Sequence, residues 1–176
     1  MATALETAEQ KVILNGIGWD TYDRLLLEHQ DRAGTRFNYD QGTLEIMVLS
    51  AEQERLKQTL TTLVELVAAE LGIDVDGVGP TTFRNKGLGK GFEADASFYI
   101  KNAGRVAGKA RIDLAVDPPP DLAIEIDITN PSLDKMAIYA ALLVPEVWRT
   151  MVITSRFWCS GLARMWRPRL ARPLLV

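Results

Sequence analysis

The chain of 176 residues, 47% hydrophobic and 24% charged, has the size and balance of one globular domain with its own core. Its single cysteine excludes an internal disulfide framework, and its single histidine, His29, argues against zinc chemistry and a Ser-His-Asp triad. No apolar run approaches the roughly 20 residues that cross a membrane, and no signal-peptide pattern is present, so we expect a soluble, cytoplasmic protein.

The charges are unevenly divided along the chain. Residues 1–149 hold all 23 acidic residues and 15 of the 20 basic ones, a net −8, whereas residues 150–176 hold five arginines and no acid. Because nucleic-acid-binding proteins are usually basic, any such binding here must rely on a local basic patch and on metal ions. We expect one domain over residues 1–149 and an atypical basic tail over residues 150–176.

The first predicted elements are a short helix and a hairpin. An amphipathic helix begins near residue 19, with Asp20 or Thr21 as its N-cap. Residues 36–39 and 43–49 alternate between apolar and polar side chains, which indicates two strands joined by a tight turn.

A longer helix follows the hairpin directly. Ser50, with Gln53 three residues later, fits a capping box, in which each residue satisfies the backbone amide of the other. Leucine and valine then repeat at helical spacing as far as Leu71, and Gly72 supplies the C-terminal stop.

The second half of the chain predicts strands over residues 81–84, 92–100 and 122–128. The last of these is apolar on both faces except for two acids, which is the pattern of a buried central strand. Ser132 is expected to cap a second helix over residues 133–143, with a further strand after it. This order predicts an α/β fold with a mixed central β-sheet flanked by helices.

Glu125 is the most informative single residue, because its immediate neighbours in the predicted strand are aliphatic. A carboxylate is costly to bury there unless it meets a cation or hydrogen-bond donors. Asp127 and Asp121 share its parity and project from the same face of the strand. Solvated acids at a strand end explain Asp121 easily and Glu125 poorly.

Asp95 is the second candidate, since its neighbours Ala94 and Ala96 leave room for an ion. Alone the pattern is weak, because aspartate is common at the start of a strand. Paired with Glu125 on an adjacent strand, it offers two hard oxygen ligands for Mg²⁺ or Mn²⁺. Such a pair is the minimum for metal-assisted hydrolysis of a phosphodiester.

Five motifs follow one another in the chain: YDQGTLEIM at 39–47, SAEQERL at 50–56, FEAD at 92–95, PPDLAIEI at 119–126, and SLDK, YA and VPEVW within 132–148. In this order they resemble the restriction-endonuclease-like family known as the Uma-two family, of the PD-(D/E)XK nuclease superfamily. The resemblance implies a restriction-endonuclease-like core that acts on DNA, and cutting two strands favours a homodimer.

The same resemblance implies the roles of the site residues. Asp95 and Glu125 would bind Mg²⁺ or Mn²⁺ with help from the carbonyl of Ile126. Glu54, on the long helix, would reach the same site as a further metal ligand or as a group that holds water.

The chain departs from the family pattern at two positions. The lysine of the superfamily's Glu-x-Lys strand is Asp127 here, and Lys135 on the following helix is its natural substitute. A lysine on a helix is, however, most often only solvated. Ala94 stands where proline is usual, which leaves Asp95 intact as a ligand.

Arg84, Lys86 and Lys90 are spread through a glycine-rich loop just before Asp95. These residues either bind nucleic-acid phosphates or belong to a mobile surface turn, and the sequence leaves both interpretations open.

Residues 150–176 stop following the family pattern and become rich in arginine, tryptophan and methionine. A frameshift near codon 149 or 150 would explain this change, and resequencing the gene tests that hypothesis. The alternative is a genuine basic tail that binds nucleic acid or a partner.

The sequence therefore predicts a Mg²⁺-dependent DNA endonuclease, with Asp95, Glu125, Lys135 and Glu54 as catalytic residues. The alternative is a catalytically inactive nuclease-fold protein that serves as a binding or regulatory module. The missing strand lysine, the acidic body and the altered tail favour that alternative.

Overall fold

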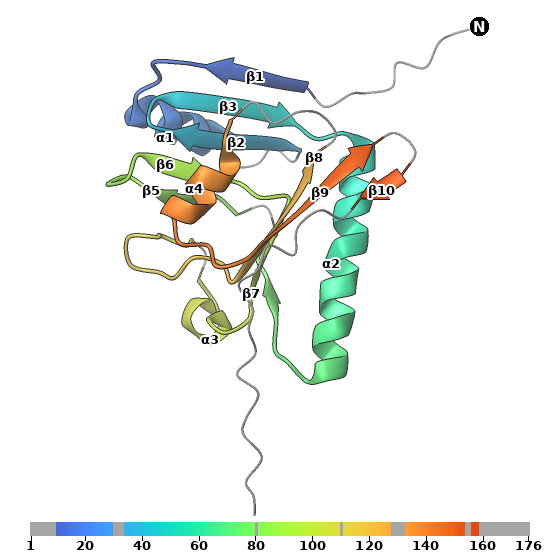
Figure 1. Cartoon of the computed structure of the whole chain (residues 1–176). Helices are drawn as coiled ribbons and strands as arrows, with labels where there is room; N and C mark the ends of the chain where they lie inside the picture. Colours follow the sequence, from blue (N-terminus) through green and yellow to red (C-terminus); the bar gives the residue numbers. More distant parts are fainter. Residues whose placement is uncertain are drawn as a thin grey trace, which may run out of the picture.

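The computed structural model describes residues 10–29, 34–79, 81–109, 111–127, 133–153 and 156–158. Within them the chain forms two five-stranded β-sheets and four helices (Figure 1), which confirms the predicted α/β class. Sheet A has the order β1-β3-β2-β6-β5, and sheet B has the order β10-β9-β8-β7-β4. No helix in this part of the chain is long and apolar enough to cross a membrane.

Sheet A is antiparallel and carries the predicted hairpin. Its strands are β1 (Gln10–Leu14), β2 (Thr35–Asp40), β3 (Thr43–Val48), β5 (Phe83–Asn85) and β6 (Lys90–Phe92). The turn between β2 and β3 needs positive φ at both central positions, and Gln41 (44°) and Gly42 (99°) supply it.

One face of sheet A is covered by α1 (Trp19–Glu28), which lies beside β2 and β3 (Figure 1). Tyr22 of the helix packs there against Phe37, Tyr39 and Leu44. The predicted N-cap, Asp20 or Thr21, was wrong, because the helix already begins at Trp19 and Gly18 takes the cap position. The Gly18 carbonyl accepts the first helical amide bonds, and no side chain caps the helix.

Sheet B is the mixed sheet that the sequence predicted. Its strands are β4 (Asp76–Gly77), β7 (Ala96–Tyr99), β8 (Leu122–Asp127), β9 (Val147–Ile153) and β10 (Arg156–Trp158). Among the described residues, β8 and β9 run parallel and the other pairs run antiparallel. The predicted tail thus begins inside β9, and from residue 159 it lies outside the described residues.

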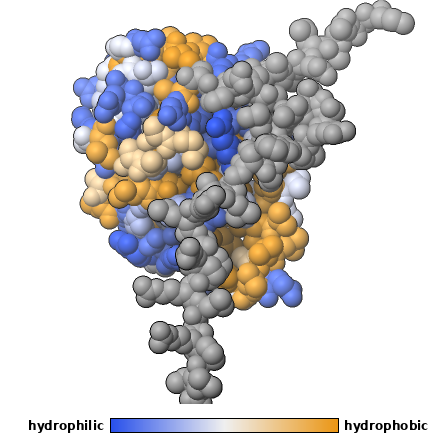
Figure 2. Space-filling model, in the orientation of Figure 1, coloured by the Kyte–Doolittle hydropathy of each residue, from blue (hydrophilic) through white to orange (hydrophobic). Residues whose placement is uncertain are grey.

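The long helix α2 (Ala51–Leu71) runs along sheet B (Figure 1) and begins with the predicted capping box. The Ser50 amide donates to Gln53 Oε1 at 2.8 Å, and the Gln53 amide donates to Ser50 Oγ at 3.2 Å. Leu56, Leu60 and Val64 pack on β8 and its neighbours. Four further aliphatic residues of the helix are exposed: Leu63, Leu66, Val67 and Leu71. Figure 2 shows apolar surface at the place that α2 takes in Figure 1.

The remaining helices are α3 (Ala103–Val106) and α4 (Lys135–Ala141). α4 is shorter than the predicted helix over residues 133–143. Asp134 is its N-cap and accepts the Ala137 amide at 3.2 Å, while the predicted cap, Ser132, lies outside the described residues.

The predicted strand over residues 92–100 is interrupted. β6 ends at Phe92 in sheet A, and β7 begins at Ala96 in sheet B, so residues 93–95 carry the chain from one sheet to the other. Glu93 accepts the Phe37 amide of sheet A at 3.0 Å, whereas the Asp95 amide donates to Ile124 of sheet B at 3.1 Å. Asp95 therefore lies where the two sheets meet.

Candidate active site

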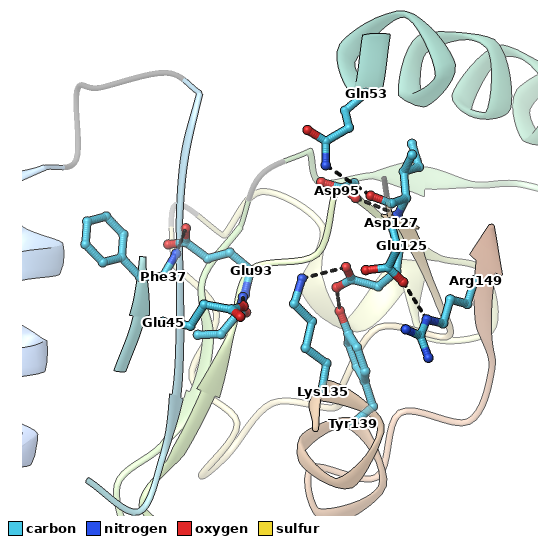
Figure 3. A network of polar contacts seen from close by, with 12 residues as sticks. Phe37, Glu45, Gln53, Glu93, Asp95, Glu125, Asp127, Lys135, Tyr139 and Arg149 are labelled. Carbon is cyan, nitrogen blue, oxygen red and sulfur yellow. Dashed lines mark hydrogen bonds and ion pairs between the residues drawn. The ribbon is translucent and has the colours of Figure 1, made fainter. Parts of the chain in front are cut away.

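Asp95 and Glu125 form a buried carboxylate pair, each only 2% exposed. Glu125 lies in β8, and Asp95 lies just before β7, which pairs with β8. Asp95 Oδ2 accepts the main-chain amide of Ile126 at 2.7 Å, which fixes its carboxylate beside the strand that carries Glu125 (Figure 3). The structure thus brings the two predicted ligands together.

The pKa of Asp95 in this pair is well above that of an ordinary aspartate. Burial, followed by the negative charge of Glu125, raises the pKa of Asp95 from 3.8 to about 7. Lys135, the Ile126 amide and Arg36 oppose that rise only in part. The two carboxylates therefore repel each other, and a cation between them would be stabilised.

Lys135 supplies one positive charge to the pair. Its Nζ lies 2.9 Å from Glu125 Oε2, and its side chain is only 10% exposed, so it is not a solvated surface lysine. Burial alone would lower the pKa of this amine, but Glu125 and Asp95 raise it above its usual value. Lys135 therefore stays charged beside Glu125.

Tyr139 is a site residue that the sequence did not single out as functional. It follows Lys135 by one turn of α4, and its hydroxyl donates to Glu125 Oε1 (Figure 3). The ring is buried and lies 4.4 Å, between centroids, from that of Phe92. The sequence signal that could have identified Tyr139 is its spacing of four residues from Lys135, which places both side chains on one face of the helix.

Asp127 stands at the superfamily's lysine position and is held by a cation of its own. Arg149, on β9, donates through Nε to the Asp127 carboxylate. The parallel pairing of β8 and β9 sets Arg149 opposite Glu125, which puts its guanidinium within reach of Asp127. The acid at this position is therefore paired and does not add an uncompensated charge to the site.

The structure does not bring Glu54 to the carboxylate pair. Its carboxylate accepts Lys57 Nζ at 2.7 Å, and its side chain is 47% exposed. The residue of α2 that does reach the site is Gln53, whose Nε2 donates to the Ile126 carbonyl at 3.1 Å.

The three basic residues of the glycine-rich loop are all held by acids. Arg84 bonds Asp23 of α1, Lys86 lies 3.3 Å from Asp20, and Lys90 bonds Asp40 at the hairpin turn. Arg84 and Lys86 line a cleft of about 990 Å³, and Lys90 does not. These ion pairs fasten the loop to α1 and sheet A.

A second buried polar cluster, absent from the sequence prediction, lies on the face of sheet A that α1 leaves uncovered. Arg36 and Asn38 of β2 and Glu45 of β3 are each at most 3% exposed, and Asn38 Nδ2 donates to Glu45 Oε1 at 3.1 Å. Glu45 also contributes to the raised pKa of Lys135, after Glu125 and Asp95. Glu45 of sheet A and the carboxylate pair therefore act on the same lysine.

A divalent metal fits the chemistry of the pair. No three His, Cys, Asp or Glu side chains of the described residues converge on one metal position. Mg²⁺, however, is commonly held by one or two carboxylates while it keeps several waters. Glu125 also opens to a pocket of about 280 Å³, whose other walls include Asp127, Lys135 and Arg149. Solvent or a substrate can therefore reach one of the two carboxylates.

Comparison with known proteins gives one family. The Uma2 family, described as "Putative restriction endonuclease", matches residues 19–169. Among the described strands this range includes all but β1, and it includes Asp95, Glu125 and Lys135. No curated protein matches the chain. Since the match covers most of its length, the chain belongs to the Uma2 family of restriction-endonuclease-like proteins.

Proposed function

We propose that this protein is a divalent-metal-dependent endonuclease that hydrolyses phosphodiester bonds of DNA. The single observation that carries the proposal is the buried pair Asp95 and Glu125, with Lys135 2.9 Å from one of the two carboxylates. The family match supports a nuclease-like function, and the carboxylate pair supports the use of Mg²⁺ or Mn²⁺.

In this proposal each side chain has one task. Asp95 and Glu125 would hold the ion, and the ion would supply the Lewis acidity that activates water and offsets phosphate charge. Lys135 stabilises the negative charge that develops on the phosphate, and in this role it replaces the missing strand lysine. Tyr139 and Gln53 position Glu125 and the Ile126 peptide by hydrogen bonds.

Two further parts of the proposal concern Glu54 and assembly. For Glu54 to hold water at the site, its carboxylate must first leave Lys57, whose amine it now binds. A homodimer would present two sites to the two strands of a duplex. Sedimentation of the protein with and without a DNA duplex measures the assembly directly.

Cleavage of supercoiled plasmid in Mg²⁺ or Mn²⁺ tests the function. The wild-type protein should nick the plasmid, and Asp95→Asn and Glu125→Gln should not. Glu65→Gln, which removes an exposed acid from α2, is the matched control and should cleave like the wild type. Equal metal-dependent nicking by all four proteins would overturn the site assignment.

The second candidate is a catalytically silent nuclease-fold binding module. It is favoured by the ion pair of Asp127 with Arg149 at the position where the superfamily has its lysine. If the wild-type protein binds DNA and Mn²⁺ but does not nick plasmid, that result would establish this function instead.

A further inference from the structure

Arg36 is a buried cation that forms no close ion pair with any described residue, although it interacts electrostatically with Glu93 and Asp95. It is only 3% exposed, and none of the ion pairs within 4 Å among the described residues includes its guanidinium. Its Nη1 donates to the Thr35 carbonyl at 3.1 Å, while its Nε has no hydrogen-bond partner. A charge buried in this way is costly, because neither water nor an ion pair compensates it.

Arg36 lines the cleft of about 990 Å³ together with Glu93 and Thr82. Glu93 stands two residues before Asp95, in the segment that joins the two sheets. Glu93 is already occupied, since it accepts the Phe37 amide and the Thr82 hydroxyl. The positive field of Arg36 also reaches Asp95, where burial and Glu125 dominate the pKa. The cleft is thus electrostatically connected to the carboxylate site.

The rim of the same cleft carries further cations, but these are paired. Lys57 bonds Glu54, and Arg84 bonds Asp23. Lys86 bonds Asp20, at 3.3 Å. Such half-exposed pairs are weak and are screened by salt, so a phosphate can exchange with the acids. Arg36 differs from them because it has no carboxylate to give up.

We propose that this cleft is the binding groove for a DNA strand and that Arg36 binds one of its backbone phosphates. A guanidinium matches a phosphate with two parallel hydrogen bonds, and a phosphate would supply the anion that the buried charge lacks. The other cations that line the cleft, Lys57, Arg84 and Lys86, bind flanking phosphates. The assignment rests on the proposed DNA endonuclease function, and it adds the path of the strand and its anchor.

Binding of a short fluorescent DNA duplex in EDTA tests the groove without requiring cleavage. Each phosphate that a protein neutralises changes the slope of log K against log salt by about 0.9. Arg36→Met should therefore lower the slope by about that amount and weaken binding about tenfold at moderate salt. Arg36→Lys keeps the charge and should keep the slope while losing part of the affinity.

Arg24→Met is the matched control, because it removes one positive charge from the exposed side of α1, outside the cleft. It should leave affinity and slope unchanged. Thermal unfolding should show Arg36→Met at least as stable as the wild type, since an uncompensated buried charge is gone. Wild-type affinity and slope in folded Arg36→Met, or an equal loss in Arg24→Met, would overturn the proposal.

The two proposals can fail separately. Suppose that Arg36→Met lowers the slope of log K against log salt but the wild-type protein does not nick plasmid. That result would refute the nuclease proposal and support the DNA-binding groove. Metal-dependent nicking that requires Asp95 and Glu125, with Arg36→Met binding like the wild type, would refute the groove alone.

Discussion

Gln53 donates from Nε2 to the main-chain carbonyl of Ile126 at 3.1 Å, while Asp95 accepts the main-chain amide of the same residue at 2.7 Å. Ile126 follows Glu125 directly in β8, so the peptide groups on both sides of this residue are held. The hydrogen bonds of Ile126 therefore connect β8 with the first turn of α2 and with the junction between the two sheets. The capping box orients Gln53 for this contact, because its Oε1 accepts the Ser50 amide.

Gln53→Leu should destabilise the protein more than the loss of a helix cap does. The substitution removes the capping acceptor, at a cost of about 1 kcal/mol, and leaves the buried Ile126 carbonyl without its donor, at a further cost of about 1–3 kcal/mol. Ser50→Ala, the control, loses the side-chain acceptor of the cap alone. Urea unfolding compares the two, and Mn²⁺ affinity should fall in Gln53→Leu only. Equal destabilisation by both variants would contradict a role for the contact with Ile126.

The raised pKa of Asp95 predicts a pH dependence of stability. Because the folded-state pKa is about 7 and the unfolded value is near 3.8, the folded protein retains a proton that the unfolded chain has lost. The free energy of unfolding of the metal-free protein should therefore fall as pH rises from about 4 to about 7, and then level off. Asp95→Asn removes this dependence, and urea titrations of both proteins across that range measure the difference.

The affinity for metal should also depend on the ionisation of Asp95, but it should rise with pH where the free energy of unfolding falls. An ion requires the ionised carboxylate, so the affinity for Mn²⁺ should rise with pH until Asp95 is deprotonated, near pH 7. Calorimetry at several pH values tests this, and proton release on binding should be largest below pH 7. A pH-independent affinity between pH 5 and about 8 would be incompatible with Asp95 as a ligand.

The long helix and the hairpin were predictable from sequence because local signals specify them. The capping box of Ser50 and Gln53, the stop at Gly72 and the turn at Gln41 and Gly42 all depend on residues close in the chain. The break between β6 and β7 was not predictable in the same way. Residues 93–95 contain no glycine or proline, and only hydrogen bonds to two different sheets divide the strand.

The carboxylate pair of the candidate site was predictable from sequence, but the residues around it were not. Glu125 was indicated by aliphatic neighbours and Asp95 by the family pattern, but the choice between Gln53 and Glu54 depends on a rotation of about 100° around a helix. The helix packs so that Gln53 faces β8 and Glu54 faces the cleft. Arg36 and Glu45 alternate with apolar residues, which predicts solvent exposure, although both are buried in the folded chain.

Lys135→Met should destabilise the protein by about 3–5 kcal/mol, because it leaves the buried charge of Glu125 without its counter-ion. Adding Glu125→Gln to the same chain removes that charge and should restore most of the stability. A thermodynamic cycle of the two single variants and the double variant measures this coupling. Lys135→Met with wild-type stability would show that the ion pair is not formed in solution.

Tyr139→Phe separates the hydrogen bond to Glu125 from the packing of the ring. The variant keeps the contact with Phe92 and loses the hydroxyl that donates to Glu125 Oε1. Tyr99→Phe is the matched control, since it also loses one buried hydroxyl bond, to the Pro118 carbonyl at 2.8 Å, on a residue that does not contact the carboxylate pair. Each substitution should lower the free energy of unfolding by about 1–2 kcal/mol.

The two tyrosine variants should differ in function while they agree in stability. Without its hydroxyl donor the Glu125 carboxylate can rotate, and misplacement of a catalytic group by about 1 Å can slow a reaction up to about 100-fold. We therefore expect Tyr139→Phe to cleave plasmid about 10- to 100-fold more slowly and to bind Mn²⁺ less tightly. Tyr99→Phe should match the wild type in both assays. If both variants slow cleavage equally, the effect comes from general loosening of the core, and Tyr139 has no positioning role.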